Sequence, residues 1–204
     1  MKQALLIGCG NKRGKNIVNG CIDAGYSVTN IGSSMSEIPT VSNIKIEWKK
    51  LDLIALHKIT KTFKQNIDFI FFNQNASSLS QHDFTELKKT LDAWTLVKGW
   101  SHSYWLSCQL PYVLIKTLEK NLNSNTKIGW MLSSFINPDI NGVDAHPDYS
   151  GNKFTNYQIM KSFAKKYNCF GINPDFNKNN NMQQLIKDIC MDNKNGNGGM
   201  LTID

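Results

Sequence analysis

The fold is decided near the N-terminus by the stretch Ala4-Leu5-Leu6-Ile7-Gly8-Cys9-Gly10-Asn11-Lys12-Arg13-Gly14-Lys15-Asn16-Ile17. A short apolar run stops at Gly8, glycines recur at Gly10 and Gly14, and apolar residues then follow at helical spacing from Ile17. This order predicts a strand, a tight turn and a helix. Glycines let the backbone approach a pyrophosphate, and a helix N-terminus offers free N–H groups, so the stretch favours a dinucleotide site. A sharp turn in a generic α/β domain is the alternative that the stretch alone leaves open.

The bulk composition indicates one soluble globular domain. The chain has 204 residues, of which 41% are hydrophobic and 19% charged. No apolar run approaches the roughly 20 residues of a membrane span. The five cysteines are dispersed without a C-x-x-C pair, which is typical of reduced thiols and argues against a zinc site or any other metal site. Because the first strand begins almost at once, we expect no leader and a cytoplasmic protein.

The net charge of +7 comes almost wholly from lysine. Arg13 is the only arginine, and the lysines are spread along the chain as on a solvated surface. A basic chain can bind nucleic acid, but this one has neither an arginine cluster nor an aromatic-basic module. The pattern therefore argues against nucleic acid as a partner.

The rest of the chain alternates strands with helices, as a doubly wound sheet requires. The expected strands are Gln3–Ile7, Tyr26–Ile31, Asn43–Trp48, Ile67–Phe72, Lys127–Leu132, Phe170–Asn173 and Met200–Ile203. The expected helices are Gly14–Ala24, Ala55–Phe63, Asp83–Tyr104, Leu106–Lys120, Tyr149–Lys166 and Met182–Cys190. We therefore predict a Rossmann-type α/β fold in three layers, a parallel sheet with helices on both faces, as a single domain over residues 1–204.

A second informative stretch is Tyr149-Ser150-Gly151-Asn152-Lys153. Residues four apart lie on one face of a helix, so Tyr149 and Lys153 are expected to point the same way. A nearby ammonium lowers the pKa of a tyrosine and makes it a usable proton donor near neutral pH. Upstream, a buried strand ends in Ser133-Ser134, where a hydroxyl can bond the same carbonyl oxygen. A surface pair on a helix is the alternative for Tyr-x-x-x-Lys alone.

Taken together, these motifs resemble the short-chain dehydrogenase/reductase family nearly end to end. Gly10-x-x-x-Gly14 is similar to its T-G-x-x-x-G-x-G loop, with Asn16 in the last glycine position. The other matching segments are Asp52-Leu53, Gln74-Asn75-Ala76-Ser77, Leu132-Ser133-Ser134, Tyr149 with Lys153, Asn173-Pro174-Asp175 and the terminal run 199–204. The resemblance implies an oxidoreductase that acts on a carbonyl or alcohol substrate.

The resemblance also implies a role for each site residue. Tyr149 exchanges a proton with the carbonyl or alcohol as hydride moves, Lys153 lowers the pKa of Tyr149 and binds the nicotinamide ribose, and Ser134 orients the carbonyl. Ser101 stands near the helix position where the family has an asparagine that holds a relay water. The implied cofactor-binding residues are Gly8, Gly10, Asn11, Lys12, Arg13, Gly14, Ser33, Ser34, Asp52, Leu53, Asn75, Ala76, Tyr149, Lys153 and Pro174.

The expected dinucleotide is NADP(H) rather than NAD(H). NAD enzymes usually place an acidic residue at the end of the second strand to bind the ribose hydroxyls. Here that position is Gly32, followed by Ser33 and Ser34. Lys12 and Arg13 lie in the glycine turn, where basic residues suit a 2′-phosphate. Exposed loop charges without a ligand are the alternative reading of these two residues.

Two departures from the family motivate a second hypothesis. Ser101 replaces an asparagine, and the segment Asp175–Asn181 is short where family members carry a substrate lid. The alternative function is therefore a non-catalytic dinucleotide-binding sensor or interaction protein.

The helical region Asp83–Lys120 carries more apolar and aromatic residues than one sheet face needs. Because the family pairs these helices across a two-fold axis, the resemblance implies a homodimer or homotetramer.

Overall fold

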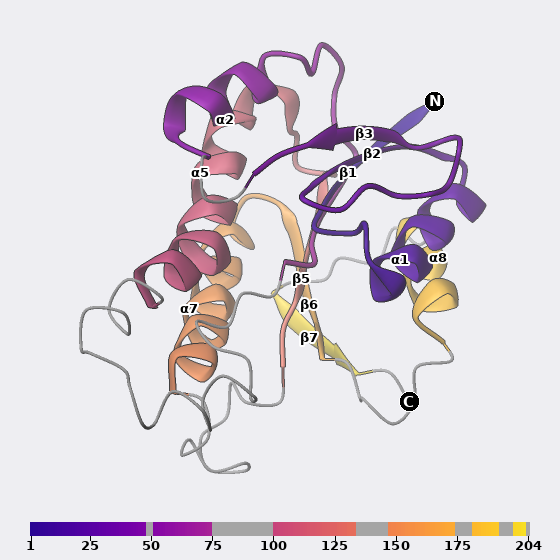
Figure 1. The fold of residues 1–204 in the computed structure, drawn as a ribbon. Coiled ribbons are helices and arrows are strands. Elements are labelled where there is room, and N and C mark those ends of the chain that lie inside the picture. The colour runs from indigo at the N-terminus through magenta and orange to yellow at the C-terminus, as the bar shows by residue number, and fades with distance from the viewer. Residues whose placement is uncertain (48–50, 75–99, 134–146, 174–180, 192–197, 203–204) are drawn as a thin grey trace.

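The computed structural model describes residues 1–47, 51–74, 100–133, 147–173, 181–191 and 198–202 (Figure 1). Its centre is a seven-stranded sheet of order β3-β2-β1-β4-β5-β6-β7 in which every neighbouring pair is parallel. The strands are β1 (Lys2–Ile7), β2 (Tyr26–Gly32), β3 (Ser42–Lys45), β4 (Phe69–Phe72), β5 (Lys127–Met131), β6 (Asn168–Asn173) and β7 (Gly199–Thr202). The doubly wound parallel sheet predicted from the sequence is confirmed.

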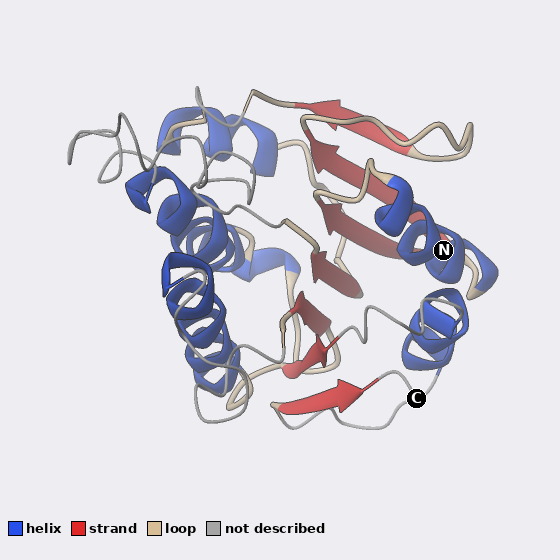
Figure 2. Ribbon diagram, turned by 60° about the horizontal axis from the view of Figure 1, so that its bottom comes forward, coloured by secondary structure: helices blue, strands red, loops and turns tan. Residues whose placement is uncertain are grey.

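Helices cover both faces of the sheet (Figures 1 and 2). On one face lie α1 (Lys12–Asp23) and α8 (Met182–Met191), and on the other α2 (Leu53–Thr60), α5 (Leu110–Thr117) and α7 (Pro147–Phe163). Residues 100–104 are helical and run through the π-helix η2 (Trp105–Gln109) into α5, which is followed by the 3₁₀ helix η3 (Glu119–Asn121). The part of the chain that the structure describes contains no helix long and apolar enough to cross a membrane.

Two hydrophobic clusters hold the layers together. Side chains alternate across each strand, so Leu5 and Ile7 pack toward α2, α5 and α7, whereas Ala4 and Leu6 pack toward α1 and α8. All four residues of β4 are buried. A continuous apolar strand of this kind is what a sheet covered on both faces requires.

The observed element boundaries differ from the expected ones where local hydrogen bonds decide them. Helix α1 begins before Gly14 because Asn11 caps it, its Oδ1 accepting the Gly14 N–H at 2.8 Å. Strand β3 ends at Lys45 rather than at Trp48. The helical run that contains Trp105 does not stop there but continues through η2. Gly25 follows α1 at φ 81°, as a C′ glycine does.

The connection from β2 to β3, residues 33–41, contains no helix. Parallel strands are usually joined by a longer crossover that includes one. Here side-chain hydrogen bonds from Asn43 hold the connection instead of a helix. The Asn43 Nδ2 donates to the carbonyls of Ser36 and Val41 at 3.0 and 3.4 Å, and the Asn43 Oδ1 accepts the Ser36 N–H at 2.8 Å. Val41 and Ile38 pack into the core on the α1 side. The connection is therefore fixed to the sheet although it is not helical.

Candidate functional site

The candidate site lies at the carboxyl ends of β1, β4 and β5. The chain leaves β1 toward β2 on one side and β4 toward β5 on the other, so the strand order changes direction between β1 and β4. In open α/β sheets, ligands bind in the crevice beyond such a switch point. Gly8, Asn73 and Ser133 follow these three strands and define that edge.

The glycines of the turn after β1 stand where no side chain fits. A Cβ on Gly10 would lie 2.0 Å from the Ser34 carbonyl oxygen, and one on Gly14 would lie 2.3 Å from the Cys9 oxygen. Gly8 has φ 76°, which favours glycine, and a Cβ there would lie 3.1 Å from the Gln74 backbone. The turn is thus packed against the segments that follow both β2 and β4.

Helix α1 begins with backbone N–H groups that lack acceptors within the helix. Asn11 satisfies the Gly14 N–H, whereas the amides that open the first turn of α1 have no acceptor within the helix. These amides and the positive end of the helix dipole favour an anion such as a pyrophosphate. Gly8, Gly10, Asn11 and Gly14 therefore lie where the sequence predicts cofactor contacts, and the Lys12 and Arg13 side chains lie outside the described part.

Two buried asparagines tie the turn to its neighbours, and the sequence analysis did not single them out. Asn30 accepts the Cys9 N–H at 3.1 Å and donates to the Ser34 carbonyl at 3.3 Å. Asn73 donates to the Gly8 carbonyl at 2.9 Å, and its own Oδ1 is buried and has no hydrogen-bond partner among the residues that the structure describes. Such an acceptor calls for a donor, and a dinucleotide carries hydroxyl and amide donors. The residues present therefore fit that group. The sequence feature that could have revealed them is an asparagine within an apolar strand, as for Asn30, or directly after one, as for Asn73.

Tyr149 and Lys153 come together on α7 as predicted. The Lys153 Nζ lies 5.4 Å from the centre of the Tyr149 ring and donates to the Met131 carbonyl at 2.7 Å. Lys153 is only 2% exposed. Because lysine is seldom buried to this degree, its ammonium is held at the carboxyl end of β5 against a considerable desolvation cost. This placement is typical of a functional lysine rather than of a surface pair.

A polar network lies behind Lys153 between α7 and the helix that contains η2. The Asn152 Nδ2 donates to the Ser103 Oγ at 2.7 Å, and the Asn152 carbonyl accepts from the Cys108 thiol at 3.4 Å. Burial raises the pKa of Cys108 to about 12, although the Lys153 ammonium acts in the opposite direction. Cys108 is therefore a neutral packing residue and not a nucleophile.

The Gln74 side chain connects the turn to this helix. Its Nε2 donates to the Leu106 carbonyl in η2 at 3.0 Å. A π-helix departs from the regular α-helical hydrogen-bond pattern. The bond from Gln74 to the Leu106 carbonyl holds this irregular turn against the end of β4. Gln74 thereby links the glycine turn, through η2, to the α7 helix that packs on η2.

The structure describes Ser101 in the helical segment that leads into η2. It lies on the exposed side of its helix, whereas Ser103 and Ser107 are buried at 1% and 3% exposure. The sequence analysis chose Ser101 from its position in the family pattern, and such a match does not fix which side of the helix a residue occupies. The inward serines are therefore residues that the sequence analysis missed.

The remaining predicted residues divide into exposed ones and ones outside the described ranges. The Asp52 carboxylate caps α2 by accepting the Ala55 N–H at 2.7 Å, and Leu53 is 59% exposed. Ser33 and Ser34 are exposed on the β2–β3 connection. The predicted residues outside the described ranges are Asn75, Ala76, Ser134 and Pro174.

A cavity of about 280 Å³ lies against the glycine turn. Its walls come from the turn and α1 on one side and from the β2–β3 connection on the other, namely Cys9, Gly10, Asn11, Lys15, Ser36, Glu37 and Ile38. A second cavity of about 370 Å³ lies near the amino ends of the strands, between Gln3, Thr29 and Lys64. Only the first adjoins the candidate site. The described residues hold no cluster of metal-ligating side chains.

Comparison with solved structures identifies the fold. No known family model and no curated protein matches the sequence. A short-chain dehydrogenase family protein from Francisella tularensis matches all of this chain and 97% of its own, with 17% identity and a TM-score of 0.74. A variant of a Serratia marcescens short-chain dehydrogenase/reductase matches all of this chain and 95% of its own, with 15% identity and a TM-score of 0.74.

The fold is that of the short-chain dehydrogenases/reductases. A carbonyl reductase from Pseudomonas aeruginosa, solved with NADP, also covers all of this chain and 96% of its own, with 12% identity and a TM-score of 0.76. The fold expected from the sequence motifs is thus confirmed over the whole chain. At these identities the likeness concerns architecture, so what this short-chain dehydrogenase/reductase-like chain binds and does is inferred from its own residues.

Proposed function

We propose that the protein is an NADP(H)-dependent oxidoreductase of the short-chain type that interconverts a carbonyl and an alcohol. The observation that carries this proposal is the buried Lys153 ammonium next to Tyr149, at the same sheet edge as the glycine turn. A chain that only needed stability would gain little from burying a lysine beside a tyrosine. An acid–base pair in a crevice beyond a switch point fits a redox site.

The residues have distinct tasks in this proposal. Tyr149 donates a proton to the carbonyl oxygen in reduction and accepts it back in oxidation, while Lys153 stabilises the phenolate that remains. The Met131 carbonyl orients Lys153, and Ser134 hydrogen-bonds the substrate oxygen. The cofactor-binding set is Gly8, Gly10, Asn11, Lys12, Arg13, Gly14, Ser33, Ser34, Asp52, Leu53, Asn75, Ala76, Tyr149, Lys153 and Pro174. The bound nicotinamide supplies or takes up the hydride.

The proposed preference for NADP(H) rests on charge at the turn. β2 ends in Gly32, so no carboxylate stands at the strand end to oppose a 2′-phosphate. Lys12 and Arg13 belong to the first turn of α1, and Ser33 and Ser34 are exposed on the connection after β2. Basic groups and hydroxyls at this place suit a phosphate.

A thermal-shift titration tests dinucleotide binding. A ligand selective for the native state raises the melting temperature by mass action, so NADPH is expected to raise it more than NADH does. Equal shifts would contradict the NADP(H) preference, and the absence of any shift would contradict dinucleotide binding. Arg13→Ala is expected to weaken NADPH more than NADH, and Lys161→Ala on the far part of α7 is the charge-matched control.

The exposed Ser101 favours a second candidate, a dinucleotide-binding sensor without turnover. The helix position at which the resembling family holds a relay water has no inward side chain at Ser101. A panel of aldehydes, ketones and quinones with NADPH separates the two candidates. Consumption of NADPH that disappears in Tyr149→Phe supports the enzyme, whereas tight NADPH binding without consumption supports the sensor.

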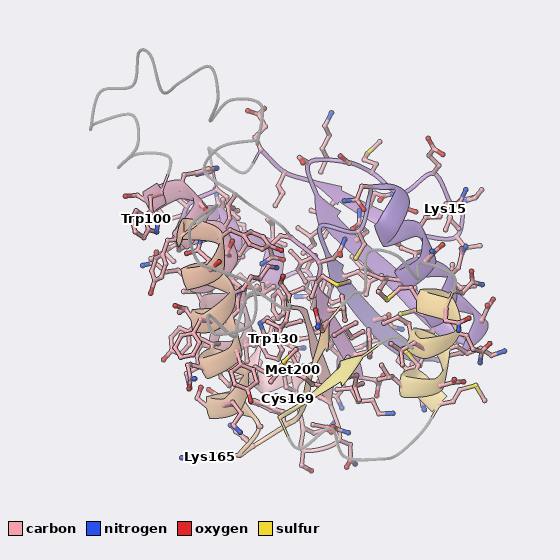
Figure 3. All side chains as sticks on the ribbon, turned by 90° about the horizontal axis from the view of Figure 1, so that it is seen from below. Lys15, Trp100, Trp130, Lys165, Cys169 and Met200 are labelled. Carbon is pink, nitrogen blue, oxygen red and sulfur yellow. The ribbon has the colours of Figure 1, made fainter. Side chains whose placement is uncertain are left out.

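We also propose that the protein is a homodimer or homotetramer. Four large apolar side chains are 38 to 51% exposed on the helices opposite α1, namely Trp100, Tyr104, Tyr112 and Phe154. Figure 3 shows Trp100 on this flank, next to α7. An apolar surface of this kind suits a self-complementary two-fold interface.

A further inference from the structure

Two of the five cysteines meet between α1 and α8, although 169 positions separate them in the sequence. Cys21 lies on α1 and Cys190 near the end of α8, and the Cys190 thiol donates to the Cys21 sulfur at 4.0 Å. Both thiols are free, and both side chains are 1% exposed or less. The sequence contains no C-x-x-C motif that would indicate such a pair. The tertiary fold alone therefore creates this pair of thiols.

Helices α1 and α8 approach each other closely at this place. Figures 1 and 2 show them side by side on one face of the sheet. A Cβ on Gly20 would lie 2.6 Å from the Gln183 carbonyl oxygen and 2.8 Å from the Ile186 Cβ, so any side chain at Gly20 would push the helices apart. Cys21 follows Gly20 directly, and Cys190 stands one turn beyond Ile186 on the same face of α8. The close contact at Gly20 thus brings the two thiols together.

The backbone of Cys190 is also anchored by two other elements. The Tyr26 hydroxyl in β2 donates to the Cys190 carbonyl at 3.2 Å, and the Lys127 Nζ in β5 donates to the same carbonyl at 3.3 Å. A disulfide requires the two sulfurs to move from 4.0 Å to about 2 Å apart, which lies within the reach of rotation about the Cα–Cβ bonds. The two helices can therefore keep their places while the side chains turn.

We propose that Cys21 and Cys190 form a reversible disulfide that joins α1 to α8 when the protein meets hydrogen peroxide. In the first step the Cys190 sulfur attacks one peroxide oxygen, the O–O bond breaks, and a sulfenic acid and one water form. In the second step the Cys21 sulfur attacks the Cys190 sulfur, the S–O bond breaks, and the thiol proton leaves with the oxygen as a second water. Two thiols and one hydrogen peroxide give one disulfide and two waters.

The order of the two steps follows from the positions of the thiols. Cys190 is the last residue but one of α8, and Met191 after it is 62% exposed. The opening of a helix end is among the least costly local motions of a protein, so peroxide reaches Cys190 first. Cys21 lies inside α1, and the hydrogen bond from the Cys190 thiol, followed by burial, raises its pKa. Cys21 is therefore slow to react with peroxide and is suited to the second step.

The disulfide stabilises the fold and leaves the candidate site unchanged. It closes a loop that contains most of the chain, and restricting so long a loop in the unfolded state favours the native state. Cys21 lies about 14 Å along the axis of α1 from Lys12, where the helix begins beside the glycine turn. The oxidised protein is therefore expected to melt about 5–10 °C higher than the reduced protein, and to bind dinucleotide equally well.

Treatment of the native full chain with hydrogen peroxide, followed by thiol counting and by peptide mapping without reductant, tests the proposal. The free thiols are expected to fall from five to three, with one cross-linked peptide that contains Cys21 and Cys190, and dithiothreitol is expected to restore all five. Cys21→Ala and Cys190→Ala are each expected to abolish the cross-link and the rise in melting temperature. Cys169→Ala removes an equally buried thiol from the opposite face of the sheet, and this control is expected to change neither.

The peptide map of the wild type decides the assignment even where a variant fails to fold. Cys9 is the competing partner, because it belongs to the same hydrophobic cluster as the pair. A cross-link that contains Cys9 overturns the assignment, and so does a native protein that keeps all five thiols until urea unfolds it. A cross-linked protein with an unchanged or lower melting temperature overturns the stabilising role. None of these readings involves a dinucleotide, so the proposed function stands or fails separately, on the titration with NADPH.

Discussion

At the scale of single residues, the most informative feature is a buried positive charge. Lys153 is buried, and its ammonium bonds the last carbonyl of β5. Burying an ammonium costs several kcal/mol, and its hydrogen bond to the Met131 carbonyl offsets part of that cost. Buried charges of this kind are common at functional sites, which makes Lys153 a residue to test.

Lys153→Met tests whether Lys153 contributes to turnover rather than to stability. Its volume is similar and it carries no charge, so turnover is expected to fall by about 10²- to 10⁴-fold, while the melting temperature is expected to stay the same or rise. Lys161→Met, at an exposed position on the same helix, is the matched control and is expected to change neither quantity. A variant that lost stability and activity together would indicate a structural lysine. Steady-state kinetics and thermal unfolding on the same samples give both readings.

Two glycines provide a contrast within the site itself. A Cβ on Gly10 would collide with the Ser34 backbone, whereas a Cβ on Gly151, between Tyr149 and Lys153, would meet nothing within 4 Å. Gly10→Ala is therefore expected to lower the free energy of unfolding and to abolish dinucleotide binding. Gly151→Ala is expected to raise the free energy of unfolding by roughly 0.5–1 kcal/mol, because glycine is a poor helix former. Urea unfolding distinguishes the two, and equal effects would contradict the packing seen at the turn.

The sequence predicted the glycine turn and the Tyr149–Lys153 pair because both depend on local spacing. Asn30 and Asn73 left only a weak signal, a polar residue at an apolar strand. The path of the β2–β3 connection left none, because it depends on how Asn43 folds that connection back against the sheet. Local patterns therefore predict the site residues that one helix or turn contributes. Residues from other segments depend on contacts between positions far apart in the sequence.

At the scale of elements, the π-helix is a feature that the sequence analysis did not predict. The sequence shows where residues 100–117 are apolar, but it does not reveal the π-helix at Trp105–Gln109. One π turn rotates the side chains after it relative to those before it. Ser101 and Ser103 both precede that turn, so Ser101 is exposed and Ser103 buried because they lie on different sides of the same helical segment. The Gln74 bond to Leu106 satisfies one irregular carbonyl, a contact that no helical periodicity encodes.

A lysine from β5 caps the C-terminus of helix α8. The Lys127 Nζ, at the start of β5, donates to the carbonyls of Ile189 and Cys190 at 2.5 and 3.3 Å. A cation at a helix C-terminus satisfies carbonyls that lack partners within the helix and complements the dipole. Lys127→Met is expected to lower the free energy of unfolding by about 1–3 kcal/mol, with Lys120→Met as the exposed control. Denaturant unfolding measures both, and a stable Lys127→Met would show that water can replace the cap.

At the scale of the whole molecule, the buried thiols make stability depend on alkaline pH. Burial raises the pKa of Cys108 and of Cys169 to about 12, from an ordinary value near 9. Between about pH 9 and 12 the unfolded chain releases thiol protons that the native protein keeps. The unfolded state then binds fewer protons, so the free energy of unfolding falls as the pH rises and is unaffected by these groups below about pH 8.

Chemical unfolding at pH 7.5, 9 and 10.5 tests this dependence. Cys169→Ala removes one such group, so the variant is expected to lose less stability than the wild type across that range, whatever its stability at pH 7.5. The lysines and tyrosines titrate in both proteins and cancel in the comparison. Parallel pH curves would show that the thiol of Cys169 does not stay protonated in the native protein.

Self-association of the protein depends on the surface that the whole fold exposes. The helical run from Trp100 through α5, and helix α7, cover the sheet with one face and leave Trp100, Tyr112 and Phe154 about half exposed. Trp105, in contrast, packs partly against the core, so a charge there would disturb folding as well as assembly.

Tyr112→Glu and Phe154→Glu are therefore the sharper probes, and both are expected to shift the wild-type oligomer to monomer. Met191→Glu, on the α1 and α8 side, is expected to leave the mass unchanged. Sedimentation velocity at micromolar concentration reads the mass directly, and a monomeric wild type would refute the oligomer. Because α7 carries Tyr149 and Lys153, dissociation is also expected to lower turnover.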